Sequence, residues 1–287
     1  MEEGFLSYTG IYINLDRSTG RRAAMESQSA RHGLADRYRR FSAADGNTLG
    51  LSTSLANGEI GCLISHYLAC RDNADASRPL HVVEDDVMFS GVMDKTIGLI
   101  VSSGLLDKYD ILFLDTVINP LQAVLPFREW KALYDRCISR DERGTVTKVN
   151  FRPIEYVATS TSYLLNHRSI KKVLSVYDGV LAGGPKDAVD IMIRKKGLAG
   201  TLRVGCLFPF LTSIRLDDVT STIAGRGSDD RSALAVNLLR HSFFVDCDIP
   251  ALLDLAEKVL PPPATQPHDR LLGRLLGFMI SPEFHRF

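Results

Sequence analysis

The sequence lacks the segments that would mark it as exported or membrane-spanning. MEEGFLSYTG opens with two acidic residues and has neither a basic segment nor an apolar core, so no signal peptide is visible. No run reaches the roughly 18 uninterrupted apolar residues that a spanning helix requires. We therefore expect a cytoplasmic protein that reaches any membrane-attached substrate from the cytoplasmic side.

The sequence also lacks a charge excess and a cysteine framework. Its 34 Lys and Arg balance 34 Asp and Glu, which argues against nucleic acid as a partner. The five cysteines are odd in number and never stand in a CxxC pair or zinc-knuckle spacing. We expect reduced thiols, and we interpret Cys62 as a packing residue rather than a metal ligand.

What is present is an alternation of strand and helix patterns in an ordinary globular composition, 45% hydrophobic over 287 residues. Patterning predicts strands over 8–15, 79–83, 109–114 and 156–165. It predicts helices over 21–32, 168–177 and 188–194, and a further helix with Asn57 as its N-cap. A hairpin is expected around 141–144. Two strands end in acidic residues, which fits an open sheet that binds its ligand beyond the carboxyl ends of the strands.

The strand at 79–83 ends in the triplet Glu84, Asp85 and Asp86. Carboxylate oxygens suit Mg²⁺ or Mn²⁺, and a strand end can hold them rigidly while leaving coordination positions for a diphosphate. Acidic residues at a strand end are also common as solvated turn formers. The triplet alone leaves both interpretations open.

A second candidate segment is NLDRSTGRR, where a strand end is followed by Arg17, Arg21 and Arg22. Arginine makes bidentate contacts to phosphate oxygens, so this segment could hold a nucleotide. No GxGxxG or P-loop accompanies it, and a solvated basic helix start explains it equally well.

Two helix starts carry further polar candidates. In GEIGCLISH, Glu59 and His66 either bind substrate or serve as a capping acid and a histidine at the core edge. In DAVD, Asp187 and Asp190 either supply a base for an acceptor hydroxyl or complement the helix dipole. Spacing does not choose between these alternatives.

Taken in order, these segments resemble glycosyltransferase family 25, the lipopolysaccharide-type β-galactosyltransferases whose relatives include the collagen galactosyltransferases. GEIGCxxSH followed by EDD is the most specific part, and the resemblance spans most of the first 225 residues. The matching segments are IYINLDRSTGRRAAM, FSAADGNTL, LANGEIGCLISHYLAC, PLHVVEDDV, TSYLLNHRSIKKVL and VDIMI.

The resemblance implies an α/β fold of the GT-A type, a single Rossmann-type domain with a mixed central sheet flanked by helices. It also implies UDP-galactose as the usual donor, Mn²⁺ (or Mg²⁺) assistance and inversion at the anomeric carbon. Carried over residue by residue, Asp86 looks like the metal ligand, and Asp190 looks like the catalytic base with Asp187 in reserve. The implied donor site comprises Asn14, Leu15, Arg17, Arg21, Glu84 and Asp85.

Two regions depart from the family pattern or lie outside it. YDILFLD ends in Asp115 where the family suggests a small residue, so either the acceptor pocket differs or Asp115 adds a carboxylate. We expect a transferase domain over 1–225 and a C-terminal helical extension over 226–287, with a polar, Gly/Ser-rich segment at 217–230. RLLGRLLGF at 270–278 could lie on the cytoplasmic face of the inner membrane or pack on the domain.

The expected function is thus metal-assisted transfer of a hexose from a UDP-sugar to a glycan or lipid-linked glycan such as lipopolysaccharide. Glycoside hydrolysis also uses paired carboxylates, but it needs neither nucleotide nor metal. A non-catalytic module that binds glycans or nucleotide sugars is the other alternative, because one fold hosts many functions.

Overall fold

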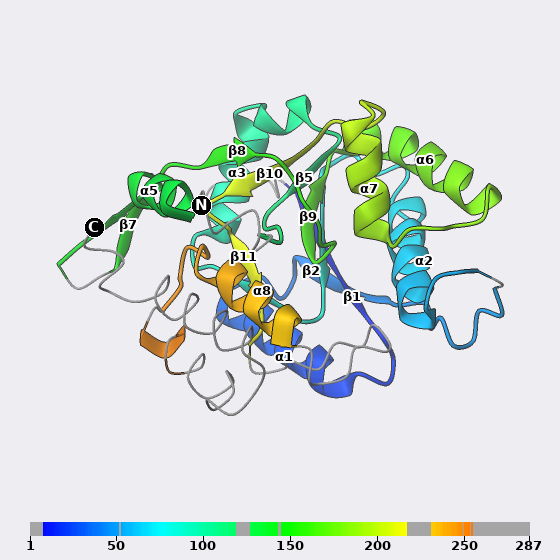
Figure 1. Cartoon of the computed structure of the whole chain (residues 1–287), viewed down its shortest axis with the longest axis horizontal. Helices are drawn as coiled ribbons and strands as arrows, with labels where there is room; N and C mark the ends of the chain where they lie inside the picture. Colours follow the sequence, from blue (N-terminus) through cyan, green and yellow to red (C-terminus); the bar gives the residue numbers. More distant parts are fainter. Residues whose placement is uncertain are drawn as a thin grey trace.

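The computed structural model describes residues 8–51, 53–118, 127–142, 145–216, 231–248, 250–252 and 254. A seven-stranded mixed sheet with the strand order β2, β1, β3, β9, β5, β10, β8 forms its centre (Figure 1). The strands are β1 Thr9–Asn14, β2 Tyr38–Ser42, β3 Leu80–Glu84, β5 Ile111–Phe113, β8 Arg152–Ile154, β9 Ser162–Leu165 and β10 Val204–Phe208. The mixed α/β architecture expected from the sequence is confirmed.

Helices cover both faces of this sheet, because the strands alternate apolar side chains between the two faces. Ile111 and Phe113 pack on the face covered by α2, α6 and α7, whereas Leu112 and Leu114 pack on the face covered by α1 and α3. The helices are α1 Thr19–Arg31, α2 Asn57–Arg71, α3 Met93–Ser102, α5 Phe127–Cys137, α6 Ile170–Ala182, α7 Val189–Leu198 and α8 Arg231–His241. Short 3-10 turns lie at η1 Leu105–Lys108 and η2 His167–Ser169.

Strand β9 determines where the polar residues meet. It lies antiparallel between β3 and β5, which run in the same direction as β1, β2 and β10. The carboxyl ends of β3 and β5 therefore flank the residues just before β9: the N–H of Glu84 donates to Thr161 O (2.8 Å), and that of Leu114 donates to Ser162 O (3.1 Å). Residues 160–161 thus stand between the ends of two parallel strands.

Several predicted elements need correction. The strand expected over 156–165 is wrong in its first part, since β9 begins only at Ser162 and the preceding residues form a loop. Asn57 is the first residue of α2 rather than its N-cap, which is Ala56. The helix expected over 168–177 continues to Ala182. The hairpin is confirmed, with β6 Ile138–Arg140 antiparallel to β7 Val146–Val149.

Helix α8 and the residues after it join the main core. Leu239 and Phe243 belong to the same apolar cluster as Ile111 and Phe113. A two-stranded sheet of β4 Val87–Phe89 and β11 Thr212–Ile214 lies beside α8. The segments at 217–230 and 270–278 lie outside the described residues, as does the proposed boundary at 225. Within the described chain, no helix is both long and apolar enough to cross a bilayer.

Candidate functional site

A pocket lies at the sheet edge where β1 and β3 end. Ile13 pairs with Glu84 across the parallel ladder, so the residues that follow these two strands emerge side by side. The pocket is lined by Ile13, Leu15, Arg17, Arg21, residues 43–47, Asn57, Gly58, Gly61, Cys62, Ser65, His66, Glu84, Asp85 and Asp86. The structure therefore brings most of the predicted donor-site residues to one cavity.

Asp85 is fixed by residues from β1 and α1. Asn14 Nδ2 donates to Asp85 Oδ2 (2.6 Å), and Arg21 Nη1 lies 3.3 Å from Asp85 Oδ1. Arg40 Nε donates to Asn14 Oδ1 (2.8 Å) and so orients the amide. Burial raises the pKa of Asp85, while Asn14 and Arg21 partly offset that rise. Both carboxylate oxygens of Asp85 are therefore held in place at the pocket.

Asp86 is the carboxylate best suited to a cation. Its Oδ2 lies 3.7 Å from Arg21 Nη1, and its Oδ1 is buried with no hydrogen-bond partner among the described residues. Burial, and next the negative charge of Glu84, raise the pKa of Asp86 to about 7, with Arg21 acting in the opposite direction. A divalent cation would supply the missing partner and offset the crowded negative charge, so the donor set fits Mn²⁺ or Mg²⁺.

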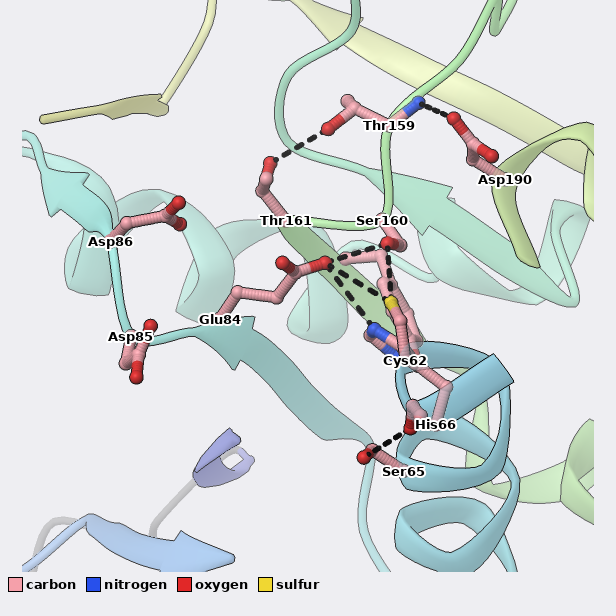
Figure 2. A network of polar contacts seen from close by, with 12 residues as sticks. Cys62, Ser65, His66, Glu84, Asp85, Asp86, Thr159, Ser160, Thr161 and Asp190 are labelled. Atoms are coloured by element: carbon pink, nitrogen blue, oxygen red, sulfur yellow. Dashed lines mark hydrogen bonds and ion pairs between the residues drawn. The ribbon is translucent and has the colours of Figure 1, made fainter. Parts of the chain in front are cut away.

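Glu84 connects the triplet to helix α2 (Figure 2). Its Oε1 accepts a hydrogen bond from Ser160 Oγ (2.6 Å) and lies 3.4 Å from His66 Nε2 and 4.0 Å from Cys62 Sγ. Burial opposes ionisation of Glu84, but the interactions with His66 and Ser160 outweigh it and place its pKa below the ordinary value. On the other side of the imidazole, His66 Nδ1 lies 2.9 Å from Tyr163 Oη.

The opposite wall of the pocket is the loop 43–47, which packs very closely on α2. A Cβ added at Gly61 would lie 2.8 Å from both Ala44 O and Gly46 N, so only glycine permits this approach without movement of backbone. On the same loop, Asp45 forms an ion pair with the predicted donor-site residue Arg17. The FSAADGNTL segment thus contributes a wall and an anchor for Arg17.

Glu59, Asp115 and Asp187 are engaged in contacts away from this pocket. Glu59 accepts a hydrogen bond from the backbone N–H of Ala56 (3.0 Å), which is the capping alternative. Asp115 is fully buried, forms an ion pair with Arg240 of α8, and accepts a hydrogen bond from Thr161 (3.1 Å). Asp187 pairs with Lys195 (2.6 Å) at a separate surface hollow. None of the three lines the pocket between β1, β3 and α2.

Asp190 is not among the residues that line the pocket, and its carboxylate lies against the loop that precedes β9 (Figure 2). Its Oδ2 accepts the N–H of Thr159 (3.1 Å), and its Oδ1 accepts the N–H of Ile191 (2.8 Å). Thr159 has φ = 96°, a conformation that non-glycine residues rarely adopt. Asp190 is near enough to Cys62 to help raise the pKa of that thiol, after burial and the charge of Glu84.

The sequence interpretation missed Ser160, Tyr163, Asp45 and Arg240. Ser160 and Tyr163 fell within a segment taken for one continuous strand, so their approach to Glu84 and His66 was not expected. Asp45 lies inside a quoted segment, and its acidic side chain opposite the arginines was the available signal. Arg240 had no such signal, because its partner Asp115 is 125 residues away in the sequence.

Comparison with known protein families identifies the family of this chain. The model of glycosyltransferase family 25, described as an LPS biosynthesis protein family, matches residues 9–192 and so covers every strand that borders the pocket. The chain belongs to glycosyltransferase family 25. It is a glycosyltransferase of the lipopolysaccharide-biosynthesis family, and Arg240 lies beyond the matched residues.

Other comparisons add less. No curated protein matches this chain. Among solved structures, the chain is similar to galactosyltransferase LgtC in complex with donor and acceptor sugar analogs. The two are 10% identical, the match covers 79% of this glycosyltransferase and 94% of that chain, and the TM-score is 0.36.

Proposed function

We propose that this glycosyltransferase moves a hexose, galactose from UDP-galactose, to a hydroxyl of a surface glycan such as lipopolysaccharide, with inversion at the anomeric carbon. The observation that carries the proposal is the pocket itself, where Asp85, Asp86 and Arg21 converge at the ends of β1 and β3. An arginine beside carboxylates suits a metal-bound diphosphate, since the arginine contacts phosphate oxygens and the carboxylates hold the cation.

Within this proposal, Asp86 would hold Mn²⁺ or Mg²⁺, and its unpartnered Oδ1 is the main support for that role. When bound, the metal supplies charge compensation for the departing nucleotide diphosphate. Leu15, Arg17 and Arg21 line the nucleotide end of the pocket, while Glu84 and Asp85 contact the ribose or the transferred sugar. Asn14 acts through Asp85, which it holds by a 2.6 Å hydrogen bond.

Inverting transfer also requires a base that takes the proton of the attacking hydroxyl. Asp190 is our first choice, because two backbone N–H groups fix its carboxylate and its charge acts on Cys62 at the pocket. Asp187 stays in reserve, since its carboxylate is engaged by Lys195. The proton moves to the carboxylate as the acceptor oxygen displaces the diphosphate in line, and no covalent enzyme intermediate forms.

Calorimetric titration with a panel of UDP-sugars, with Mn²⁺ and then with a chelator, tests the donor and metal assignments. UDP-galactose should bind to the wild type only with metal, and Asp86→Asn should lose this metal-dependent binding while remaining folded. Asp75→Asn is a matched control, because Asp75 is exposed and pairs only with Lys171 among the described residues. Unchanged metal-dependent binding by Asp86→Asn would remove the metal assignment.

The base assignment needs a kinetic comparison. Asp190→Asn should lower kcat by about 10²–10⁴-fold with donor affinity retained, whereas Asp187→Asn should leave kcat close to the wild-type value. The reverse ranking would transfer the role to Asp187. Absence of binding to any nucleotide sugar by the folded wild type would instead favour a non-catalytic glycan-binding member of the family. Peripheral contact with the cytoplasmic face of the inner membrane stays a prediction.

A further inference from the structure

A cluster of three different ligand types lies on the inner wall of the pocket. Cys62 Sγ, His66 Nε2 and a carboxylate oxygen of Glu84 all lie within 4.8 Å of one another. Cys62 and His66 are four residues apart on α2 and so share one helix face, while Glu84 ends β3 directly opposite (Figure 2). All three line the pocket, which gives an ion a path from solvent.

Two separations within this cluster are close to those of a tetrahedral zinc site. Zinc bonds of about 2.0–2.1 Å to nitrogen and oxygen and 2.3 Å to sulfur place tetrahedral ligands about 3.4 Å apart for nitrogen and oxygen, and about 3.6 Å apart for sulfur and oxygen. The observed separations are 3.4 Å from His66 Nε2 to Glu84 Oε1 and 4.0 Å from Cys62 Sγ to the same oxygen. A shift of the thiol by a few tenths of an ångström would bring its separation from Glu84 to the tetrahedral value.

The surrounding residues suit this role. Tyr163 Oη lies 2.9 Å from His66 Nδ1, and a phenol hydroxyl can either donate or accept a hydrogen bond. The ring can therefore keep its proton on Nδ1, facing Tyr163, while Nε2 binds a metal, as ligating histidines commonly do. The hydroxyl of Ser160, 2.6 Å from Glu84 Oε1, orients that carboxylate, and a water from the pocket can fill the fourth position.

We propose that Cys62, His66 and Glu84 form a binding site for Zn²⁺ or a similar borderline divalent ion, separate in its donor set from Asp86. Binding forms a metal–sulfur bond and releases the thiol proton of Cys62 to solvent. Thiolate and imidazole favour such ions, whereas Mn²⁺ and Mg²⁺ favour the oxygen ligands of the triplet. The sequence-based interpretation of Cys62 as a packing residue is then incomplete. This proposal stands independently of the proposed transfer reaction.

Cobalt binding to the reduced, full-length protein tests the site, because a Co²⁺–thiolate bond gives a charge-transfer absorption that oxygen-ligated Co²⁺ does not. We expect this absorption in the wild type, its displacement by Zn²⁺, and its loss in Cys62→Ser. Cys70→Ser is the matched control, since Cys70 lies on the same helix and is buried against Ile170. All five cysteines are described and the other four are buried, so no second accessible thiol competes.

Two further variants separate this site from the proposed transferase metal. Asp86→Asn should keep the cobalt–thiolate absorption even if it loses metal-dependent UDP-galactose binding. Tyr163→Phe should keep the absorption but weaken Co²⁺ affinity by about 10–100-fold, as loss of an orienting hydrogen bond does. Thermal unfolding of each variant verifies folding. No thiolate absorption in the folded wild type with excess Co²⁺, or absorption retained in folded Cys62→Ser, would overturn the proposal.

Discussion

The buried ion pair between Asp115 and Arg240 gives the sharpest stability prediction. The side chains are 0% and 3% exposed, and Thr161 completes the contact by donating to Asp115. Replacing Arg240 with Met keeps much of the side-chain volume but leaves the Asp115 carboxylate buried without its cation. Removing one partner of such a pair costs about 3–5 kcal/mol, a large part of a typical unfolding free energy.

Urea unfolding of the wild type, Arg240→Met and the double variant Asp115→Asn/Arg240→Met measures this cost. The single variant should lose about 3–5 kcal/mol, and the double variant should recover much of it, because no buried charge is left unpaired. Arg168→Met provides the matched control. The partner of Arg168 is Asp107, 3.0 Å away, and both side chains are more than half exposed, so this substitution should change little.

Equal effects of Arg240→Met and Arg168→Met would refute the reasoning, and so would a double variant less stable than Arg240→Met. The expected result would also bear on domain organisation. A residue of the proposed C-terminal extension over 226–287 would then stabilise the transferase core through the end of β5.

Three other predictions follow from local geometry. Burial lowers the pKa of His81 to about 3, so below about pH 6.5 the unfolded chain takes up a proton that the folded chain does not. The free energy of unfolding should therefore fall by up to about 1.4 kcal/mol per pH unit as the pH drops from about 6.5 towards 3. Thermal unfolding of His81→Gln over this range should show a weaker dependence of stability on pH. Gly61→Ala should weaken UDP-sugar binding in calorimetry, because its Cβ meets the backbone of residues 44–46, whereas Gly20→Ala, with nothing within 4 Å, should not. Ser160→Ala should raise the pKa of Glu84 in a carboxyl NMR titration, since it removes a 2.6 Å hydrogen bond to the ionised form.

The sequence was sufficient for the features that depend on local pattern. Short runs of apolar, β-branched and aromatic residues predicted β1 and β3 within a residue or so, and the acidic triplet at the end of β3 does line a pocket with Arg17 and Arg21. Parallel neighbouring strands bring their carboxyl ends to one sheet edge, which is why a linear pattern was enough to group these residues.

The sequence was insufficient where a contact depends on chain direction or on distant residues. Tyr156–Leu165 has one β-rich composition throughout, yet only its last four residues pair, since β9 fits antiparallel between β3 and β5 for that length. Asp115 looked like an extra site carboxylate because Arg240, which neutralises it, comes from a helix far along the chain. Propensity carries no information about such partners.

The antiparallel insertion of β9 explains why polar chemistry gathers at Glu84 rather than at every strand end. In an all-parallel arrangement, the neighbour of Glu84 would be another strand terminus pointing the same way. Here the chain enters β9 at that edge, so Ser160 contacts Glu84 at the end of β3 and Thr161 contacts Asp115 after β5. Tyr163, two residues further along, contacts His66. Glu84 is consequently shared between the donor pocket and the Cys62–His66 pair. An ion bound by that pair would withdraw Glu84 from a nucleotide sugar, so zinc occupancy and donor binding should compete.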